Sequence, residues 1–398
     1  MQSIFKKNLG TALLLIVVGL QFFNYLGSIL LTPDLSKSLH GYRNLKTDLP
    51  FLVDWVWITV FGRIIGGYIL CKLAICIDFF NTMRIIVISH TLLAILVSSI
   101  NITSTILYQD IQFLFAHRFF HAFLIPASFM LPTLFLLNQN EKKPIMLSAY
   151  SLLAVSTGSL LIYKYLAIVE FAKGWNNIIF YVSIISCICY FFAEKFLRNE
   201  TCHPNFIGKK PTFSRLLLVC TFGGICGISF SYHFAFVDSY VNNVIICKGY
   251  TNASFSYFYY ALITAIIPVA KLVYKKDIFI PLKFSSIGII LTTIIMTVTP
   301  TISLSVYILE QIIFGVLVAV LIVPCHSLVH QLFRNTNNYF KGMFWFTTFS
   351  TLFSITPHFF LKLLGIKSLP WLGIIYVIPI ALLFILALSK YEKEIKTR

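Results

Sequence analysis

Twelve long apolar runs set the limits on how this 398-residue chain can fold. About 20 apolar residues of α-helix cross the hydrocarbon core of a bilayer, and each run reaches that length. Backbone amides inside hydrocarbon need partners within the protein, which an α-helix supplies. The sequence therefore predicts transmembrane helices at roughly 9–31, 49–71, 84–107, 112–137, 145–168, 175–197, 215–237, 253–274, 280–299, 304–332, 340–364 and 370–390.

The composition supports this interpretation, because 58% of the residues are apolar and only 11% are charged. In globular proteins about 45–50% of residues are apolar and about 25% are charged. The excess apolar surface of this chain therefore has to face lipid. The first run follows Lys6 and Lys7 as a signal peptide would, but no small-residue cleavage site follows it. We therefore expect a retained helix and an all-α polytopic membrane protein.

The net charge of +17 is spread over many short connections. If the N-terminus is cytosolic, most Lys and Arg residues fall in cytosolic segments, as the positive-inside rule requires. Both termini are then expected in the cytoplasm. A nucleic-acid partner is not expected, because the basic residues form no single patch; the expected partner is the lipid bilayer.

The longest cytosolic connection, 198–214, divides the runs into six and six. We expect an N-terminal bundle over 1–197 and a C-terminal bundle over 215–398. Transporters built from repeats have this organisation. The outer connections are short apart from 32–48, which excludes a large extracellular module.

Neither a metal nor a catalytic site stands out in the sequence. Cys187 and Cys189 point to different sides of a helix, and only Cys247 of the nine cysteines falls in an outer connection. There is no Ser, His and Asp set at one depth and no glycine-rich phosphate loop. We expect no cofactor, no metal and no enzymatic activity.

Ionisable side chains within the apolar runs are candidate functional groups, because each costs about 2.5–3.5 kcal/mol at the bilayer centre. Asp54, Arg118 and Glu310 share the outer third of their runs in this topology. They could form a network that opens and closes with an outer gate. The alternative for Asp54 and Glu310 is that they reach the outer headgroups.

Histidines offer a second set of candidates. His117 and His121 are spaced i,i+4, as are His326 and His330, which could place two imidazoles on one metal ion. Proton handling by His121 or His233 is a second interpretation, because histidine titrates near physiological pH. Packing inside the bundle is the third.

Four stretches resemble the major facilitator superfamily, and within it the metabolite:proton symporters that include proline/betaine-, shikimate- and 2-oxoglutarate-type permeases. FGRIIGGYILCKL at 61–73 is similar to that group's R-P-x-G-G run and keeps its Arg and both Gly. RFFHAF resembles its helix-four arginine motif, with Arg118 at the Arg position. The other two are KGWNNIIFYV at 173–182 and QLFRNTNNYFKG at 331–342.

The chain departs from this group in two places. The loop CKLAICIDFFNTMR keeps Asp78 as its acid but has lost most of the paired basic residues. In GLQFFNYLG, Gln21 stands at the position of the group's first Glu and Asn24 at that of its Asp. Amides keep hydrogen-bonding capacity but do not titrate.

The resemblance implies a major facilitator fold of twelve helices, in a monomeric secondary transporter of the bacterial inner membrane that moves a small polar or zwitterionic solute by alternating access. Loss of the acids suggests transport uncoupled from protons. Proton coupling through Glu310, Asp54 or a histidine, and a sensor or scaffold that no longer transports, remain alternatives. The expected solute-binding residues are Gln21, Asn24, Tyr25, Arg118, His121, Tyr232 and His233, and the expected gating or coupling residues are Asp54, Arg63, Asp78 and Glu310.

Overall fold

A computed structural model describes the backbone of residues 2–38, 49–99, 111–139, 144–168, 175–198, 212–236, 251–274, 277–298, 304–333, 336–364 and 369–396. Within these ranges it describes the side chains of residues 5–26, 57–96, 116–137, 144–161, 178–198, 212–229, 257–274, 277–295, 305–333, 339–354, 371 and 373–394.

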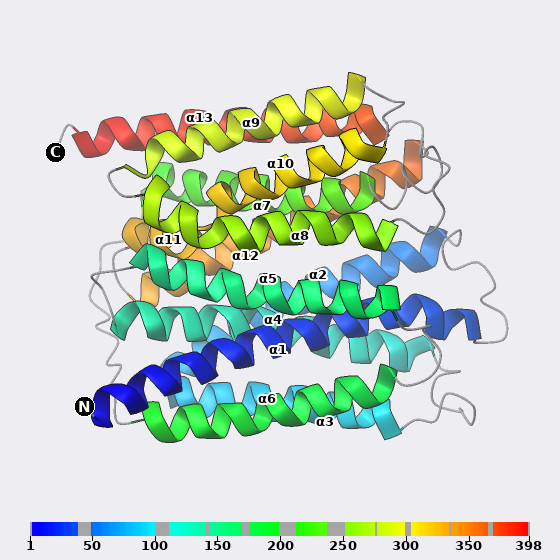
Figure 1. The fold of residues 1–398 in the computed structure, drawn as a ribbon, viewed down its shortest axis with the longest axis vertical. Helices are drawn as coiled ribbons and strands as arrows, with labels where there is room; N and C mark the ends of the chain where they lie inside the picture. The colour runs from blue at the N-terminus through cyan, green and yellow to red at the C-terminus, as the bar shows by residue number, and fades with distance from the viewer. Residues whose placement is uncertain are drawn as a thin grey trace. The chain divides into compact units, whose positions relative to one another are not determined.

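Every element assigned in the described ranges is a helix, which confirms the all-α prediction (Figure 1). The helices are α1 Gln2–Ser38, α2 Leu49–Ile77, α3 Phe79–Ser99, α4 Ile111–Gln139, α5 Pro144–Ile168, α6 Trp175–Leu197, α7 Phe213–Phe236, α8 Thr251–Pro268 with the π-helical turn η2 Val269–Val273, α9 Phe279–Val298, α10 Leu304–Ile322, α11 Cys325–Phe333, α12 Thr336–Leu364 and α13 Leu369–Lys396.

One predicted run differs from the structure, because 304–332 forms the two helices α10 and α11. The break falls at a turn through Val323 and Pro324. Proline has no backbone N–H to continue the helical ladder, and its ring crowds the preceding turn. The carbonyl of Pro324 then accepts the hydrogen bond from Leu328 N that begins α11.

The helices have the lengths and compositions of membrane spans. Across the described residues, eight of them are long and apolar enough to cross a bilayer, and three more apolar helices are shorter. Large apolar side chains lie on their outer surfaces, for example Phe284 at 70% and Leu386 at 66% exposure. Such surfaces suit hydrocarbon rather than water.

The chain divides into two compact units. The first comprises Met1–Glu141 and Thr157–Pro204, and the second comprises Lys142–Ser156 and Asn205–Arg398. Helix α5 contributes to both, its first part to the second unit and the remainder to the first. The domain boundaries expected from the sequence stay a prediction.

Close backbone contacts hold α2 against α4 in the first unit. A Cβ atom on Gly62 would lie 2.7 Å from the Phe119 carbonyl oxygen, and one on Gly66 would lie 1.9 Å from that of Phe123. Glycines spaced i,i+4 allow two membrane helices to approach this closely. This packing fixes which side chains of α2 and α4 face each other.

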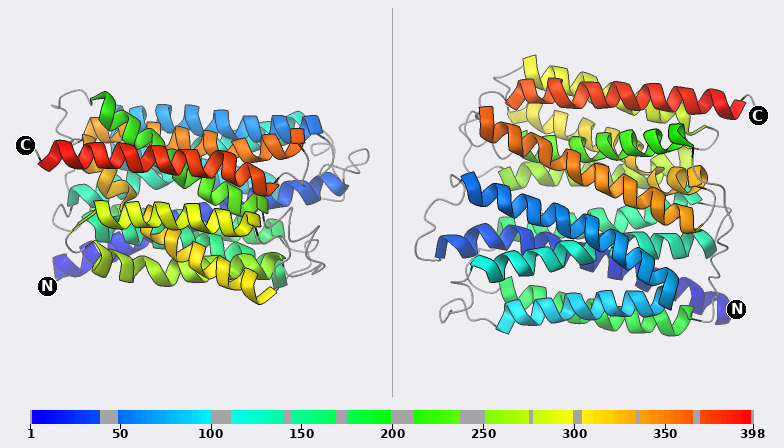
Figure 2. Two further views of the ribbon diagram at one scale, coloured as in Figure 1. Left: turned by 90° about the horizontal axis from the view of Figure 1, so that it is seen from above. Right: turned by 180° about the vertical axis from the view of Figure 1, so that it is seen from behind.

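The packing of the first unit recurs in the second. Helices α2 and α4 pack together as α8 and α10 do, and the neighbours α3 and α6 correspond to the neighbours α9 and α13 (Figures 1 and 2). Glycines also recur at close contacts, since a Cβ on Gly315 of α10 would lie 2.6 Å from the Phe258 carbonyl oxygen of α8. Repeated bundles of this kind are common in transporter folds.

Candidate functional site

Two arginines meet one buried tyrosine inside the first unit. Tyr25 of α1 is 1% exposed and packs against Ala122 and Ile125 of α4. The guanidinium carbons of Arg63 and Arg118 lie 5.1 and 5.3 Å from the centre of its ring. Arg63 Nη2 also donates a hydrogen bond of 2.5 Å to the Tyr25 hydroxyl. We call Arg63 and Arg118 the arginine pair.

The contact between α2 and α4 positions the arginine pair. Thr59 and Arg63 lie one turn apart on α2, and Arg118 lies on the facing helix α4. Arg118 Nε donates a hydrogen bond of 2.9 Å to Thr59 Oγ1. The same two helices are in glycine contact at Gly62 and Gly66, so the polar bond and the backbone contact depend on one helix register.

The arginine pair concentrates positive charge where water is scarce. Arg118 is 4% exposed, and Arg63 is partly buried. Arg63 makes no ion pair with any side chain in the described ranges, and its buried Nε has no hydrogen-bond partner there. Guanidinium groups stay charged in proteins and match the two oxygens of a carboxylate. The arrangement therefore suits an anion with planar oxygens.

A row of three imidazoles lies on α3 and α4 close to Arg118. The ring centres of His117 and His121 are 4.5 Å apart, and those of His121 and His90 are 5.4 Å apart. His90 Nε2 lies 3.4 Å from Ser128 Oγ. His121 was a predicted site residue, whereas His90 was not, because a single histidine in an apolar run gives no spacing signal.

Gln21 and Asn24 connect α1 to α6. Gln21 Nε2 donates to Ser186 Oγ at 3.0 Å, and Asn24 Nδ2 donates to Ser183 Oγ at 2.7 Å. Both amides are buried, and their carbonyl oxygens accept no hydrogen bond within the described structure. The donors thus hold two helices together, and contact of these residues with a solute stays a prediction.

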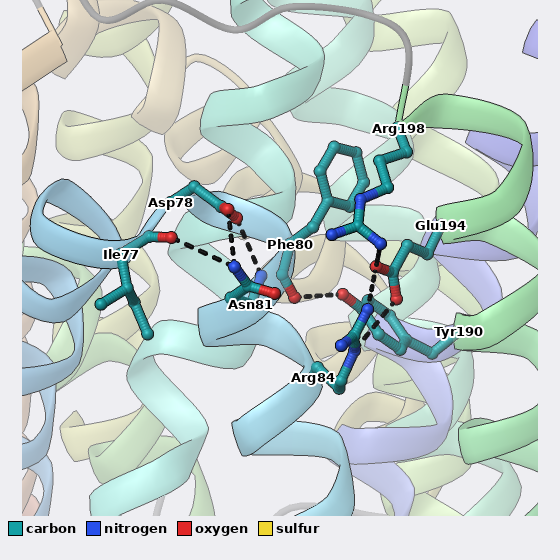
Figure 3. Close-up of polar contacts among 8 residues, drawn as sticks. All are labelled: Ile77, Asp78, Phe80, Asn81, Arg84, Tyr190, Glu194 and Arg198. Atoms are coloured by element: carbon teal, nitrogen blue, oxygen red, sulfur yellow. Dashed lines mark hydrogen bonds and ion pairs between the residues drawn. The ribbon is translucent and has the colours of Figure 1, made fainter.

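Asp78 lies between the end of α2 at Ile77 and the start of α3 at Phe79 (Figure 3). Its Oδ1 accepts a hydrogen bond of 2.9 Å from Asn81 N, which is the contact of a helix N-cap. Its φ of 96° turns the chain sharply between the two helices. Asp78 was expected to act in gating; the structure gives it this capping role, and gating stays a prediction.

The sequence did not predict the charged cluster near the turn between α2 and α3. Glu194 of α6 is 4% exposed and pairs with Arg84 of α3 at 2.5 Å and with Arg198 at 3.3 Å (Figure 3). Tyr190 also reaches from α6, donating to the Phe80 carbonyl oxygen at 2.5 Å. These contacts join the ends of α3 and α6, which lie side by side.

The second unit contains a buried carboxylate. Glu310 of α10 is 7% exposed, and neighbouring Gln311 is fully buried at 0%. The expected network of Asp54, Arg118 and Glu310 stays a prediction, because Arg118 and Glu310 belong to different units. The side chains of Asp54, Tyr232 and His233 lie outside the described residues. Within the described ranges no group of three or more His, Cys, Asp or Glu residues is placed to hold a metal.

Comparison with known proteins places this architecture. The sequence matches no protein-family model and no curated protein. The structure is similar to the human organic anion transporter MFSD10, with a TM-score of 0.73 and 12% identity over 96% of this chain and 99% of that one. It is also similar to the proton:xylose symporter XylE of the major facilitator superfamily, with a TM-score of 0.71 and 13% identity over 96% and 95% of the two chains.

The chain has the major facilitator fold. The fold expected from the sequence resemblance is therefore confirmed. Together with the apolar helices, it makes the chain a multi-pass membrane protein. At identities of 12% and 13%, the similarity to these two structures shows the fold alone.

Proposed function

We propose that this protein is a secondary transporter that moves a small organic solute bearing a carboxylate by alternating access. The observation that carries the proposal is the arginine pair around Tyr25 in the first unit. The fold supports it, since both structural neighbours are transporters and one is described as an organic anion transporter.

The chemistry of the arginine pair favours an anionic solute over a neutral one. Each arginine inside a membrane protein carries a cost of about 2.5–3.5 kcal/mol on insertion scales, and two neighbouring cations also repel each other. A bound carboxylate offsets both costs through charge-assisted hydrogen bonds. A neutral solute would leave them in place.

A comparison of a carboxylate with its amide tests this proposal. A panel of small mono- and dicarboxylates is titrated into purified protein, and each hit is compared with the amide of the same shape. We expect binding of a carboxylate, at least about tenfold weaker binding of its amide, and loss of binding in Arg118→Gln. Equal binding of acid and amide would contradict the proposal.

The matched control is Arg198→Gln, because the Arg198 side chain is 57% exposed and already pairs with Glu194 at 3.3 Å. This variant should bind the carboxylate as the parent does. If both variants lose binding equally, the effect belongs to general charge or folding and not to the arginine pair.

We propose further that transport is uncoupled from protons and takes place in a bacterial inner membrane. Uncoupled transport is supported by Gln21 and Asn24, which do not titrate and stand where the resembled symporters carry acids. The bacterial inner membrane is proposed from the same sequence resemblance. Uptake into liposomes is measured with and without an imposed pH gradient. Accumulation driven by the gradient would instead indicate coupling at Glu310, Asp54 or a histidine, and absence of any uptake above that of Arg118→Gln would favour a sensor or scaffold.

A further inference from the structure

One carboxylate and two aromatic side chains share a buried face of α10. Tyr307 lies three residues before Glu310, and Phe314 lies four residues after it, which places them one turn away on the same face. All three are buried, with exposures of 0%, 7% and 2% in that order. Gln311 is adjacent to Glu310 and fully buried.

Two polar side chains of α10 have no hydrogen-bond partner among the described residues. Both carboxylate oxygens of Glu310 are buried and accept no hydrogen bond there, and neither the oxygen nor the nitrogen of the Gln311 amide makes one. None of the ion pairs found in the described ranges involves Glu310. Buried polar groups are otherwise hydrogen-bonded in nearly all native structures, so an orphaned group needs an explanation.

Protonation of Glu310 would account for only part of these observations. A neutral carboxyl group still needs an acceptor for its O–H and leaves its second oxygen without a donor. A ligand that donates hydrogen bonds and carries positive charge would satisfy the oxygens of both residues.

The surroundings select the class of cation. Calcium and magnesium ions take six or more oxygen ligands, whereas Glu310 and Gln311 offer three among the described residues, and no group of three His, Cys, Asp or Glu residues is placed there to hold a metal. Aromatic faces attract organic ammonium groups. Phe314 lies beside a second aromatic residue, Phe258 of α8, and their ring centres are 6.1 Å apart. The available chemistry thus fits an ammonium group better than a metal ion.

We infer that Glu310 and Gln311 form a binding site for an organic ammonium group. Glu310 supplies the countercharge, Gln311 accepts a hydrogen bond, and the aromatic rings contact the carbon atoms next to the nitrogen. The inference rests on the second unit alone. It goes beyond the proposed function by giving the second unit a site for a charged group of the opposite sign.

Cation selectivity of the purified protein tests the inference. Methylammonium, tetramethylammonium, sodium and potassium chlorides are titrated at constant ionic strength and pH, with binding followed by calorimetry. We expect saturable binding of at least one ammonium salt and none of sodium or potassium over the same range. Equal responses to all four salts, or a response to pH alone, would overturn the inference.

Variants assign the binding to Glu310. The neutral isostere Glu310→Gln should weaken ammonium binding at least about tenfold, and Gln311→Leu should weaken it less. The matched control is Glu392→Gln in the same unit, because Glu392 already pairs with Lys283 at 2.6 Å. Unchanged ammonium binding in Glu310→Gln overturns the inference. If that variant fails to fold, the parent's selectivity among the four salts and Gln311→Leu decide the question.

Two further titrations separate this site from the arginine pair. Arg118→Gln should keep ammonium binding, and Glu310→Gln should keep carboxylate binding, so either proposal can fail without the other.

Discussion

Replacing Gly66 by alanine should separate α2 from α4. The new Cβ would lie 1.9 Å from the Phe123 carbonyl oxygen and 2.5 Å from the carbonyl carbon and Cα of that residue. These are backbone atoms, which cannot rotate away as a side chain can. Ordinary carbon–oxygen contacts begin near about 3.3 Å, so the helices must move apart by about 1.4 Å at this point.

The displacement has two energetic consequences. Overpacking of this kind costs about 1–3 kcal/mol. A shift of more than 1 Å would also stretch the hydrogen bond from Arg118 Nε to Thr59 Oγ1, now 2.9 Å, beyond bonding distance. Interhelical hydrogen bonds in membranes contribute about 0.6 kcal/mol. The expected loss of stability is therefore about 1.6–3.6 kcal/mol, accompanied by weaker carboxylate binding.

The adjacent residue offers a matched control for this change. A Cβ on Gly67 would meet Pro126 Cβ at 3.5 Å, which is an ordinary contact. Both variants have the same composition, so their thermal unfolding in detergent and their carboxylate binding can be compared directly. Gly67→Ala should unfold near the parent and bind normally, and Gly66→Ala should do neither. Equal behaviour of the two variants would refute the role assigned to the α2–α4 contact.

Three further predictions concern packing and helix ends. Asn24→Ala and Ser183→Ala, singly and together, should show a coupling of about 0.6 kcal/mol in unfolding measurements, and simple additivity would contradict the bond between α1 and α6. Gly227→Ala should destabilise the protein more than Gly224→Ala. The Cβ at position 227 would lie 2.0 Å from a backbone carbonyl oxygen of α12, whereas that at position 224 would lie 3.3 Å from side chains that can move. The order of the two melting temperatures checks this. Asp78→Ala should cost about 1 kcal/mol by removing the cap of α3, whereas Asp78→Asn should cost much less, and equal melting temperatures would exclude the cap as a stabilising contact.

Several candidate site residues could be named from the sequence because they break a local pattern. Arg118 and Glu310 are ionisable groups within apolar runs, and such groups are costly enough to mark a candidate site wherever they occur. Tyr25 and Arg63 were also named, but their contact with each other was not predicted. It depends on how α1 and α2 are rotated about their axes, which sequence spacing within one helix does not define.

The contacts of other residues could not be predicted from the sequence for a related reason. Glu194 lies near the end of an apolar helix and resembles an ordinary boundary residue, although the structure buries it between Arg84 and Arg198. His90 becomes part of a row of imidazoles only because α3 lies against α4. Gln21 and Asn24 stand out in the sequence as amides in an apolar run, yet their partners on α6 are more than 150 residues away in the chain.

The sequence by itself determined the class of this protein. The length of an apolar run is a local property, and a lipid environment converts it directly into a spanning helix. Only the tertiary structure decided which polar groups meet, because that depends on the rotation and register of helices brought together by small residues such as Gly62 and Gly66. The arginine pair around Tyr25, and a Glu310 carboxylate with no hydrogen-bond partner among the described residues, are products of that packing.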